Sequence, residues 1–209
     1  FIHPISVIIE RAFTRLKQKG NFTISDIIKE IEADEKSEKE NKNAAIGLFE
    51  AAKTWGVFSE TDTSVTQIED LITAGTTTVL DLSVYNSVGA FNVRALVIGL
   101  ISRKIFNQRM TARREEEVKS VAKGLDLSSE EEKKEYPLVW MFIDEAHEFL
   151  PLVGKTAATE ALIQLLREGR QPGISLVLAT QQPGQIHRDV MTQSDIVISH
   201  RVTSAPDLE

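Results

Sequence analysis

Cysteine is absent from this chain of 209 residues, which excludes disulfides, thiolate metal sites and a thiol nucleophile. No run of about 18 apolar residues is present, so no transmembrane helix and no membrane partner are expected. The first residues show neither a basic leader nor a small-residue cleavage site, which argues against a signal peptide. These absences favour a cytoplasmic protein, and the missing initiator Met predicts a chain that begins within a longer one.

The chain also has fewer basic than acidic residues. The formal net charge is −7 and the sequence pI is near 5.3. A protein that coats nucleic acid gains affinity by neutralising phosphates with Lys and Arg, so this composition argues against that class. A ring-shaped motor that confines its positive charge to pore loops remains compatible with it.

The first 75 residues predict a helical subregion. Pro4 suits a first helical position, and apolar residues recur at helix spacing up to Gly20, which suits a C-terminal cap. Thr23 and Asp26 form a capping-box pattern that predicts the start of a second helix.

From residue 76 the pattern changes to apolar, β-branched runs that alternate with helical periodicity. This alternation predicts an α/β fold with a mostly parallel sheet covered on both faces. The charged segment 111–136 is expected to be either a solvated helix extension or an insertion. Strands are predicted at 76–82, 138–143, 174–179 and 195–202, and helices at 90–108, 156–169 and 183–193.

Two acidic residues, Asp144 and Glu145, follow the apolar strand 138–143. Ligands of parallel sheets bind at the carboxyl ends of strands. There, Asp144 can hold a magnesium ion through water and Glu145 can orient an attacking water, which is what phosphoryl transfer needs. The alternative is a strand that simply ends in polar residues.

The next strand also ends in polar residues, Thr180 and Gln181. An amide at this position can bond the terminal phosphate or the attacking water, and Thr180 is the accompanying candidate for nucleotide binding. The turn signal in Gln182-Pro183-Gly184 offers a purely structural reason for the same polarity.

Arg170 lies between these two strands, just beyond Gly169, which is expected to end a helix. An arginine there commonly complements the helix C-terminus. Its functional alternative is a finger that reaches a phosphate bound by a neighbouring subunit and stabilises transition-state charge.

Three further features receive structural interpretations. Gly154-Lys155-Thr156 resembles the end of a GxxxxGK[ST] loop, but position 149 is Phe149 and the segment is expected to begin a helix near Thr156. His147 has no second His or Cys at ligand spacing. Asp81 is expected to form a turn, with a role facing the site as its alternative.

Taken in order, TTTVLDL, WMFIDEAHEFLP, LLREGRQPGISLVLATQQP and DIVISHRVTSAPD closely resemble the HerA/FtsK family of hexameric P-loop DNA translocases. The resemblance implies a RecA-like core over residues 76–209 that uses ATP and Mg²⁺. It implies that Asp144 is the Walker B magnesium ligand, Glu145 the catalytic glutamate, Gln181 the sensor amide and Arg170 the finger given to the adjacent subunit. By the same resemblance the partners are DNA, further copies in a homo-hexamer and a NurA-like nuclease, and the process is DNA end processing and repair.

The chain departs from that family because it contains no Walker A loop. The backbone amides and lysine of that loop hold the phosphates, so the isolated chain is expected to bind ATP weakly or not at all and to be inactive. The P-loop strand belongs in the middle of such a sheet, and its loss predicts an exposed edge prone to self-association. The alternatives are a conjugation or secretion ATPase of the same superfamily, a DEAH-type helicase and a catalytically inactive P-loop adaptor.

Overall fold

The computed structural model describes residues 3–61, 65–85, 91–123 and 136–200. The chain divides into two compact units, residues 1–66 and residues 67–209. Within the described ranges, no helix combines the length and the apolar character that crossing a membrane requires.

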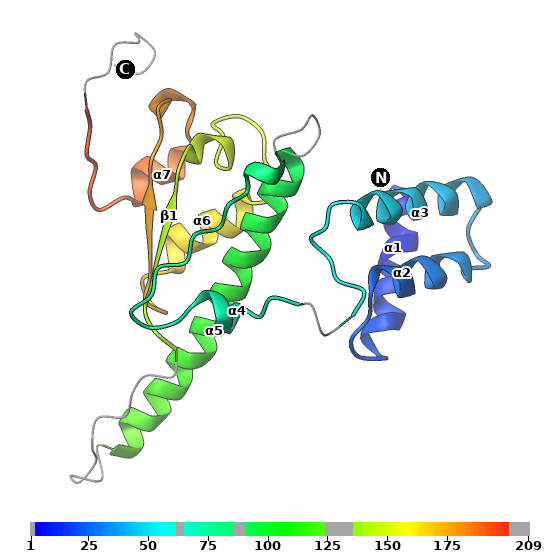
Figure 1. Ribbon diagram of the computed structural model, residues 1–209, viewed down its shortest axis with the longest axis horizontal. Coiled ribbons are helices and arrows are strands. Elements are labelled where there is room, and N and C mark those ends of the chain that lie inside the picture. The colour runs from blue at the N-terminus through cyan, green and yellow to red at the C-terminus, as the bar shows by residue number, and fades with distance from the viewer. Residues whose placement is uncertain (1–2, 62–64, 86–90, 124–135, 201–209) are drawn as a thin grey trace. The chain divides into compact units, whose positions relative to one another are not determined.

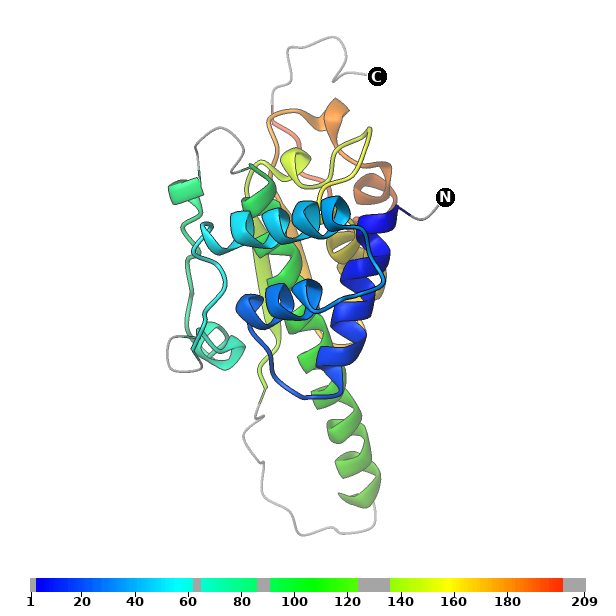
Figure 2. The same ribbon diagram turned by 90° about the vertical axis from the view of Figure 1, so that its right-hand side faces the viewer.

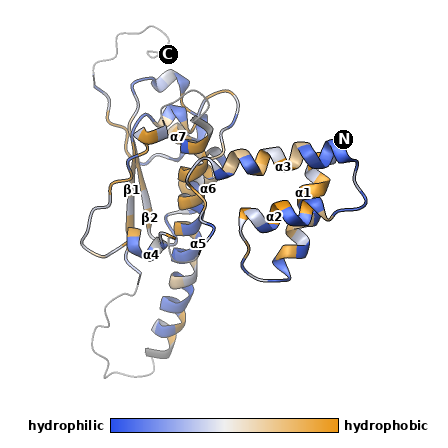
Figure 3. Ribbon diagram, turned by 45° about the vertical axis from the view of Figure 1, so that its right-hand side comes forward, coloured by the Kyte–Doolittle hydropathy of each residue, from blue (hydrophilic) through white to orange (hydrophobic). Residues whose placement is uncertain are grey.

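Unit 1 is built from three mutually packed helices, α1 (Pro4–Lys17), α2 (Ile24–Glu32) and α3 (Lys39–Lys53) (Figure 2). The predicted capping box is confirmed, because Thr23 Oγ1 accepts the Asp26 backbone N–H and the Asp26 carboxylate accepts the Thr23 N–H. Apolar positions of the helices (Figure 3) meet in a separate core. Its buried members are Ile8, Ala12, Leu16, Ile27, Ile31 and Ala45.

One buried carboxylate links the end of α2 to α1 and to the loop that follows α2. Asp34, directly beyond α2, accepts a hydrogen bond of 2.7 Å from the Ser37 hydroxyl and pairs with Arg11 Nη2 at 2.9 Å. The Ser37 hydrogen bond, the Lys36 backbone N–H and the Arg11 charge hold the pKa of Asp34 below its ordinary value of 3.8, although burial opposes them.

We therefore expect Asp34→Asn to lower the free energy of unfolding of unit 1 by about 2 kcal/mol at neutral pH. Because the folded-state pKa is the lower one, the stabilisation is complete above the unfolded-state value of about 3.9 and is lost as the pH falls through the folded-state value. Urea unfolding followed by Trp55 fluorescence, in a Trp140→Phe background, measures it. Glu35→Gln, a substitution of an exposed neighbour, is the control. If the difference in free energy of unfolding between wild type and Asp34→Asn were the same at about pH 2 as at neutral pH, the prediction would be wrong.

Unit 2 contains the only two strands of the described residues, flanked by helices (Figure 1). The structure confirms an α/β arrangement in this limited form. The elements are α4 (Ile68–Leu71), η2 (Ser83–Tyr85), α5 (Phe91–Lys123), β1 (Val139–Ile143), η3 (Ala146–Glu148), α6 (Thr159–Glu168), β2 (Ile174–Leu178), η4 (Pro183–Gln185) and α7 (Arg188–Gln193).

The two strands pair in parallel, from Val139 opposite Ile174 to Ile143 opposite Leu178. Alternate side chains of β1 point to opposite faces, and Val139, Met141 and Ile143 join the core formed with α5 and α6. On the other face, Trp140 and Phe142 stack at 6.3 Å and are 66% and 71% exposed. The prediction that both faces are covered is therefore wrong for the described residues.

Two predicted strands are also wrong. Residues 76–82 form no strand, and Val79 within them is 83% exposed. Residues 195–200 are likewise unpaired, and 201–202 lie outside the described residues. A β-branched run becomes a strand only when a neighbour accepts its backbone hydrogen bonds, and neither run meets one among the described residues. The expected self-association through a free sheet edge stays a prediction.

The helix predicted at 90–108 is present and continues, since α5 runs to Lys123. Residues 111–123 therefore form the helix extension that was one of the two alternatives for the charged segment, and residues 124–135 lie outside the described residues. Gly99 permits close packing of α5, because a Cβ there would lie 2.6 Å from the Ala157 carbonyl oxygen.

Arg109 of α5 is 2% exposed and forms hydrogen bonds with residues that precede both strands. It donates from Nε to the Pro172 carbonyl at 2.8 Å and from Nη1 to the Tyr136 carbonyl at 2.7 Å.

Candidate functional site

The carboxyl ends of β1 and β2 lie side by side because the strands are parallel. Their pairing continues past the strands, with Ala179 N–H donating to the Ile143 carbonyl and Ala146 N–H to the Ala179 carbonyl, both at 2.9 Å. The residues that follow the strands, Asp144–Glu145 and Thr180–Gln181, are thereby brought to one edge of the sheet, which is the edge where parallel sheets bind ligands.

Asp144 is exposed at this edge, and its Oδ1 accepts the Glu145 backbone N–H at 2.9 Å. Mg²⁺ keeps several waters and takes one or two carboxylates together with substrate phosphates, so a single exposed carboxylate fits such an ion. No group of three potential metal ligands occurs among the described residues.

Glu145 and Gln181 are in direct contact. The Gln181 side-chain amide donates to Glu145 Oε1 at 2.6 Å, and the Gln181 backbone N–H lies 3.4 Å from Oε2. Glu145 has φ of 47°, the only left-handed conformation among the described non-glycine residues. Such a backbone costs about 1–2 kcal/mol, and strain of this kind gathers at functional sites. The turn directs the Glu145 side chain toward the end of the neighbouring strand.

His147 joins this contact and was not predicted to do so. Its Nδ1 lies 2.9 Å from Thr180 Oγ1 and 3.4 Å from Glu145 Oε2. Thr180 is thus beside the acidic pair, as expected for a residue of the site, but its hydroxyl faces His147. The sequence signal that could have revealed this contact is the position of both residues just past neighbouring strands.

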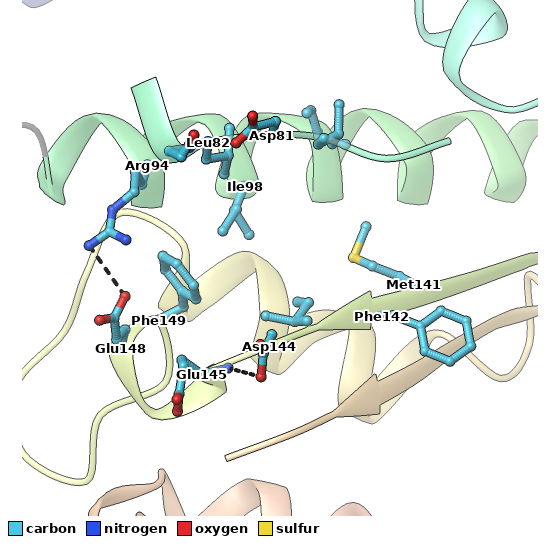
Figure 4. A pocket seen from close by; sticks show the side chains of 14 residues that line it. Asp81, Leu82, Arg94, Ile98, Met141, Phe142, Asp144, Glu145, Glu148 and Phe149 are labelled. Atoms are coloured by element: carbon cyan, nitrogen blue, oxygen red, sulfur yellow. Dashed lines mark hydrogen bonds and ion pairs between the residues drawn. The ribbon is translucent and has the colours of Figure 1, made fainter. Parts of the chain in front are cut away.

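A pocket of about 550 Å³ adjoins the acidic pair on the side of α5. Asp144 and Glu145 stand at its edge, and Arg94 of α5 pairs with Glu148 at 3.3 Å (Figure 4). Asp81 also lines it, and its Oδ1 accepts the Ser83 backbone N–H at 2.9 Å. Hydrogen bonds from the Ser83 hydroxyl and N–H lower the pKa of Asp81. Asp81 thus forms a turn with Ser83 and also lines the pocket.

Arg170 is not at this edge. It occupies an exposed turn at the amino end of β2, where its carbonyl accepts the Gly173 N–H at 3.2 Å. The five residues of β2 separate it from Gln181 by about 16 Å of strand. Arg170 therefore does not meet Glu145 within one copy of the chain.

The segment Gly154-Lys155-Thr156 does not form a phosphate loop in the structure. It precedes α6, which begins at Thr159 rather than near Thr156, and the strand before it ends at Ile143. Thr156 Oγ1 donates to the Phe149 carbonyl at 2.9 Å, and Lys155 lies 3.3 Å from a Glu160 carboxylate oxygen. Both side chains thus have partners within the loop and α6.

Comparison with known proteins places these features in context. No family model matches the chain. It is 27% identical over 152 residues to the DNA double-strand break repair helicase HerA of Pyrococcus furiosus, covering 66% of this chain and 27% of that protein. It is 29% identical over 119 residues to the probable DNA double-strand break repair helicase HerA of Methanocaldococcus jannaschii, covering 53% of this chain and 24% of that protein. The chain spans about a quarter of the length of these relatives, and in sequence it is related to HerA-type DNA repair helicases.

Proposed function

We propose that this chain forms the acidic and sensor part of an ATP-driven DNA translocase motor with a RecA-like core. The observation that carries the proposal is the contact between the Glu145 carboxylate and the Gln181 amide, beside the exposed Asp144, at the carboxyl ends of two parallel strands. The similarity to HerA helicases supports the DNA repair setting.

In this proposal each residue has one task. Asp144 holds hydrated Mg²⁺ against the phosphates, and Glu145 orients the water that attacks the terminal phosphorus. As that bond forms, the bond to the bridging oxygen of ADP breaks. Gln181 senses the terminal phosphate or the water from the neighbouring strand, with Thr180 beside it.

The phosphate cradle must come from elsewhere, because these 209 residues contain no GxxxxGK[ST] loop. We use the term complete motor for this chain assembled with the polypeptide segment that provides the loop. The location of Arg170 at the opposite end of β2 supports a ring in which one copy acts on the nucleotide of the next. DNA, a homo-hexamer and a NurA-like nuclease are the proposed partners.

The test is ATP hydrolysis by the complete motor with and without duplex DNA. A DNA-stimulated rate, together with displacement of a triplex-forming strand from the duplex, supports a translocase. Hydrolysis that DNA leaves unchanged would favour a conjugation or secretion ATPase of the same superfamily. The absence of hydrolysis would favour a catalytically inactive adaptor and would refute the proposal.

A further inference from the structure

The two oxygens of the Glu145 carboxylate are held in different ways. Among the described residues, Oε1 has one partner, the side-chain amide of Gln181 at 2.6 Å, and Gln181 is an exposed residue. Oε2 lies between two groups, the Gln181 backbone N–H and His147 Nδ1, each at 3.4 Å. Oε1 can therefore exchange its partner by rotation of one exposed side chain, whereas Oε2 faces a fixed backbone group and a largely buried ring.

His147 is held in a fixed position by its surroundings. Its side chain is 15% exposed and it belongs to η3, directly after the turn at Glu145. Its Nδ1 lies 2.9 Å from Thr180 Oγ1, which also accepts the Gln182 backbone N–H at 3.0 Å. The end of β2 thus fixes the position of the imidazole ring at the end of β1.

The chemistry of the ring decides which tautomer suits this arrangement. With hydrogen on Nδ1, the ring donates to Thr180 Oγ1 and faces Glu145 Oε2 with a positive edge. With hydrogen on Nε2, the Nδ1 lone pair would face the lone pairs of the carboxylate at 3.4 Å. The second form could accept a hydrogen bond from the Thr180 hydroxyl, but only the first avoids repulsion between Nδ1 and Glu145 Oε2.

We propose that His147 is a positioning residue for the hydrolysis reaction: with Thr180 it anchors Oε2 of Glu145, so that Oε1 alone exchanges the Gln181 amide for the attacking water. The inference rests on the proposed function, because it assigns Glu145 to that water. Without the anchor, the carboxylate rotates about its terminal torsions and Oε1 is no longer kept in place. Misplacement of a reacting group by about 1 Å can cost a hundredfold in rate.

Three substitutions of His147 distinguish an anchor from a space-filling residue. In His147→Asn the side-chain NH₂ replaces Nδ1–H, whereas in His147→Gln the NH₂ lies farther out, near the position of Nε2. For the complete motor we expect kcat to fall about tenfold or more in His147→Ala and His147→Gln, with KM for ATP unchanged within about twofold. His147→Asn should keep kcat within about threefold of wild type.

A second readout uses the 209-residue chain alone and needs no hydrolysis. In ¹H–¹⁵N spectra, the Gln181 side-chain NH₂ group that donates to Glu145 should have a different chemical shift in wild type and in Glu145→Gln. The Glu145→Gln variant therefore gives the reference position of this signal without the carboxylate. We expect His147→Ala to move the Gln181 signal toward the Glu145→Gln position and His147→Asn to leave it near that of wild type. Far-UV circular dichroism and Tm establish that each variant is folded.

The results separate the two proposals. If the wild-type complete motor does not hydrolyse ATP, the proposed function fails, and the spectra still decide whether His147 anchors Glu145. A folded His147→Ala with an unchanged Gln181 signal, or with unchanged kcat in an active motor, would overturn the inference. So would a His147→Asn variant as impaired as His147→Ala.

Discussion

Replacing Glu145 by Gln is expected to slow ATP hydrolysis by the complete motor about a hundredfold or more while ATP binding remains. The substitution preserves the size of the side chain, and its carbonyl oxygen can still accept the Gln181 amide that now bonds Oε1 at 2.6 Å. It removes the negative charge that orients and polarises the attacking water. Steady-state hydrolysis and equilibrium binding of a fluorescent ATP analogue measure the two effects separately.

Glu148→Gln is the matched control for this substitution. Glu148 is a carboxylate of the same pocket, but it pairs with Arg94 at 3.3 Å rather than with Gln181. We expect its hydrolysis rate to stay within a few fold of wild type, because it does not reach the neighbouring strand end. A Glu145→Gln motor that kept more than half of the wild-type rate would remove Glu145 from the reaction.

Replacing Arg170 by Ala is expected to reduce hydrolysis by about a thousandfold, the scale typical of losing an arginine that stabilises phosphoryl-transfer charge in trans. The physical reason is location. Arg170 is exposed at the amino end of β2, about 16 Å of strand away from Gln181, so we expect it to act on the nucleotide of a neighbouring copy rather than on that of its own chain. Arg167→Ala is the control, since Arg167 lies near the same helix end but pairs with Asp189.

Mixing the two inactive variants tests delivery in trans directly. An interface in which an Arg170→Ala copy contributes Glu145 and a Glu145→Gln copy contributes Arg170 contains one intact site. We therefore expect hydrolysis to reappear when the two proteins are mixed and allowed to exchange subunits. A mixture that remains as inactive as its components, although exchange is demonstrated by fluorescence energy transfer, would contradict an arginine acting across the interface.

Local chemistry explains which parts of the fold were predictable. The capping box of Thr23 and Asp26 lies within four consecutive residues, so the start of α2 followed from sequence. The apolar runs of β1 and β2 likewise predicted both strands to within about a residue. The β-branched run 76–82 carries the same local signal but forms no strand, because pairing depends on a distant neighbour that its own sequence does not specify.

The candidate site shows the same division. The sequence predicted Glu145 and Gln181 as site residues beyond the ends of two strands, and the parallel pairing of those strands brings the two residues together. It did not predict the left-handed backbone of Glu145, since glycine and asparagine are the residues that usually adopt it. The hydrogen bond between His147 and Thr180 was not predicted either, because it also depends on that turn and on the register of the two strands.

We propose that this chain carries the reacting groups of an ATPase but not its phosphate cradle. The decisive experiment is titration of the 209-residue chain with a fluorescent ATP analogue and Mg²⁺. We expect no saturation up to about 1 mM, a standard binding free energy weaker than about −4 kcal/mol. Micromolar binding would contradict it and would identify a phosphate-binding segment within these residues, with Gly154-Lys155-Thr156 the first to mutate.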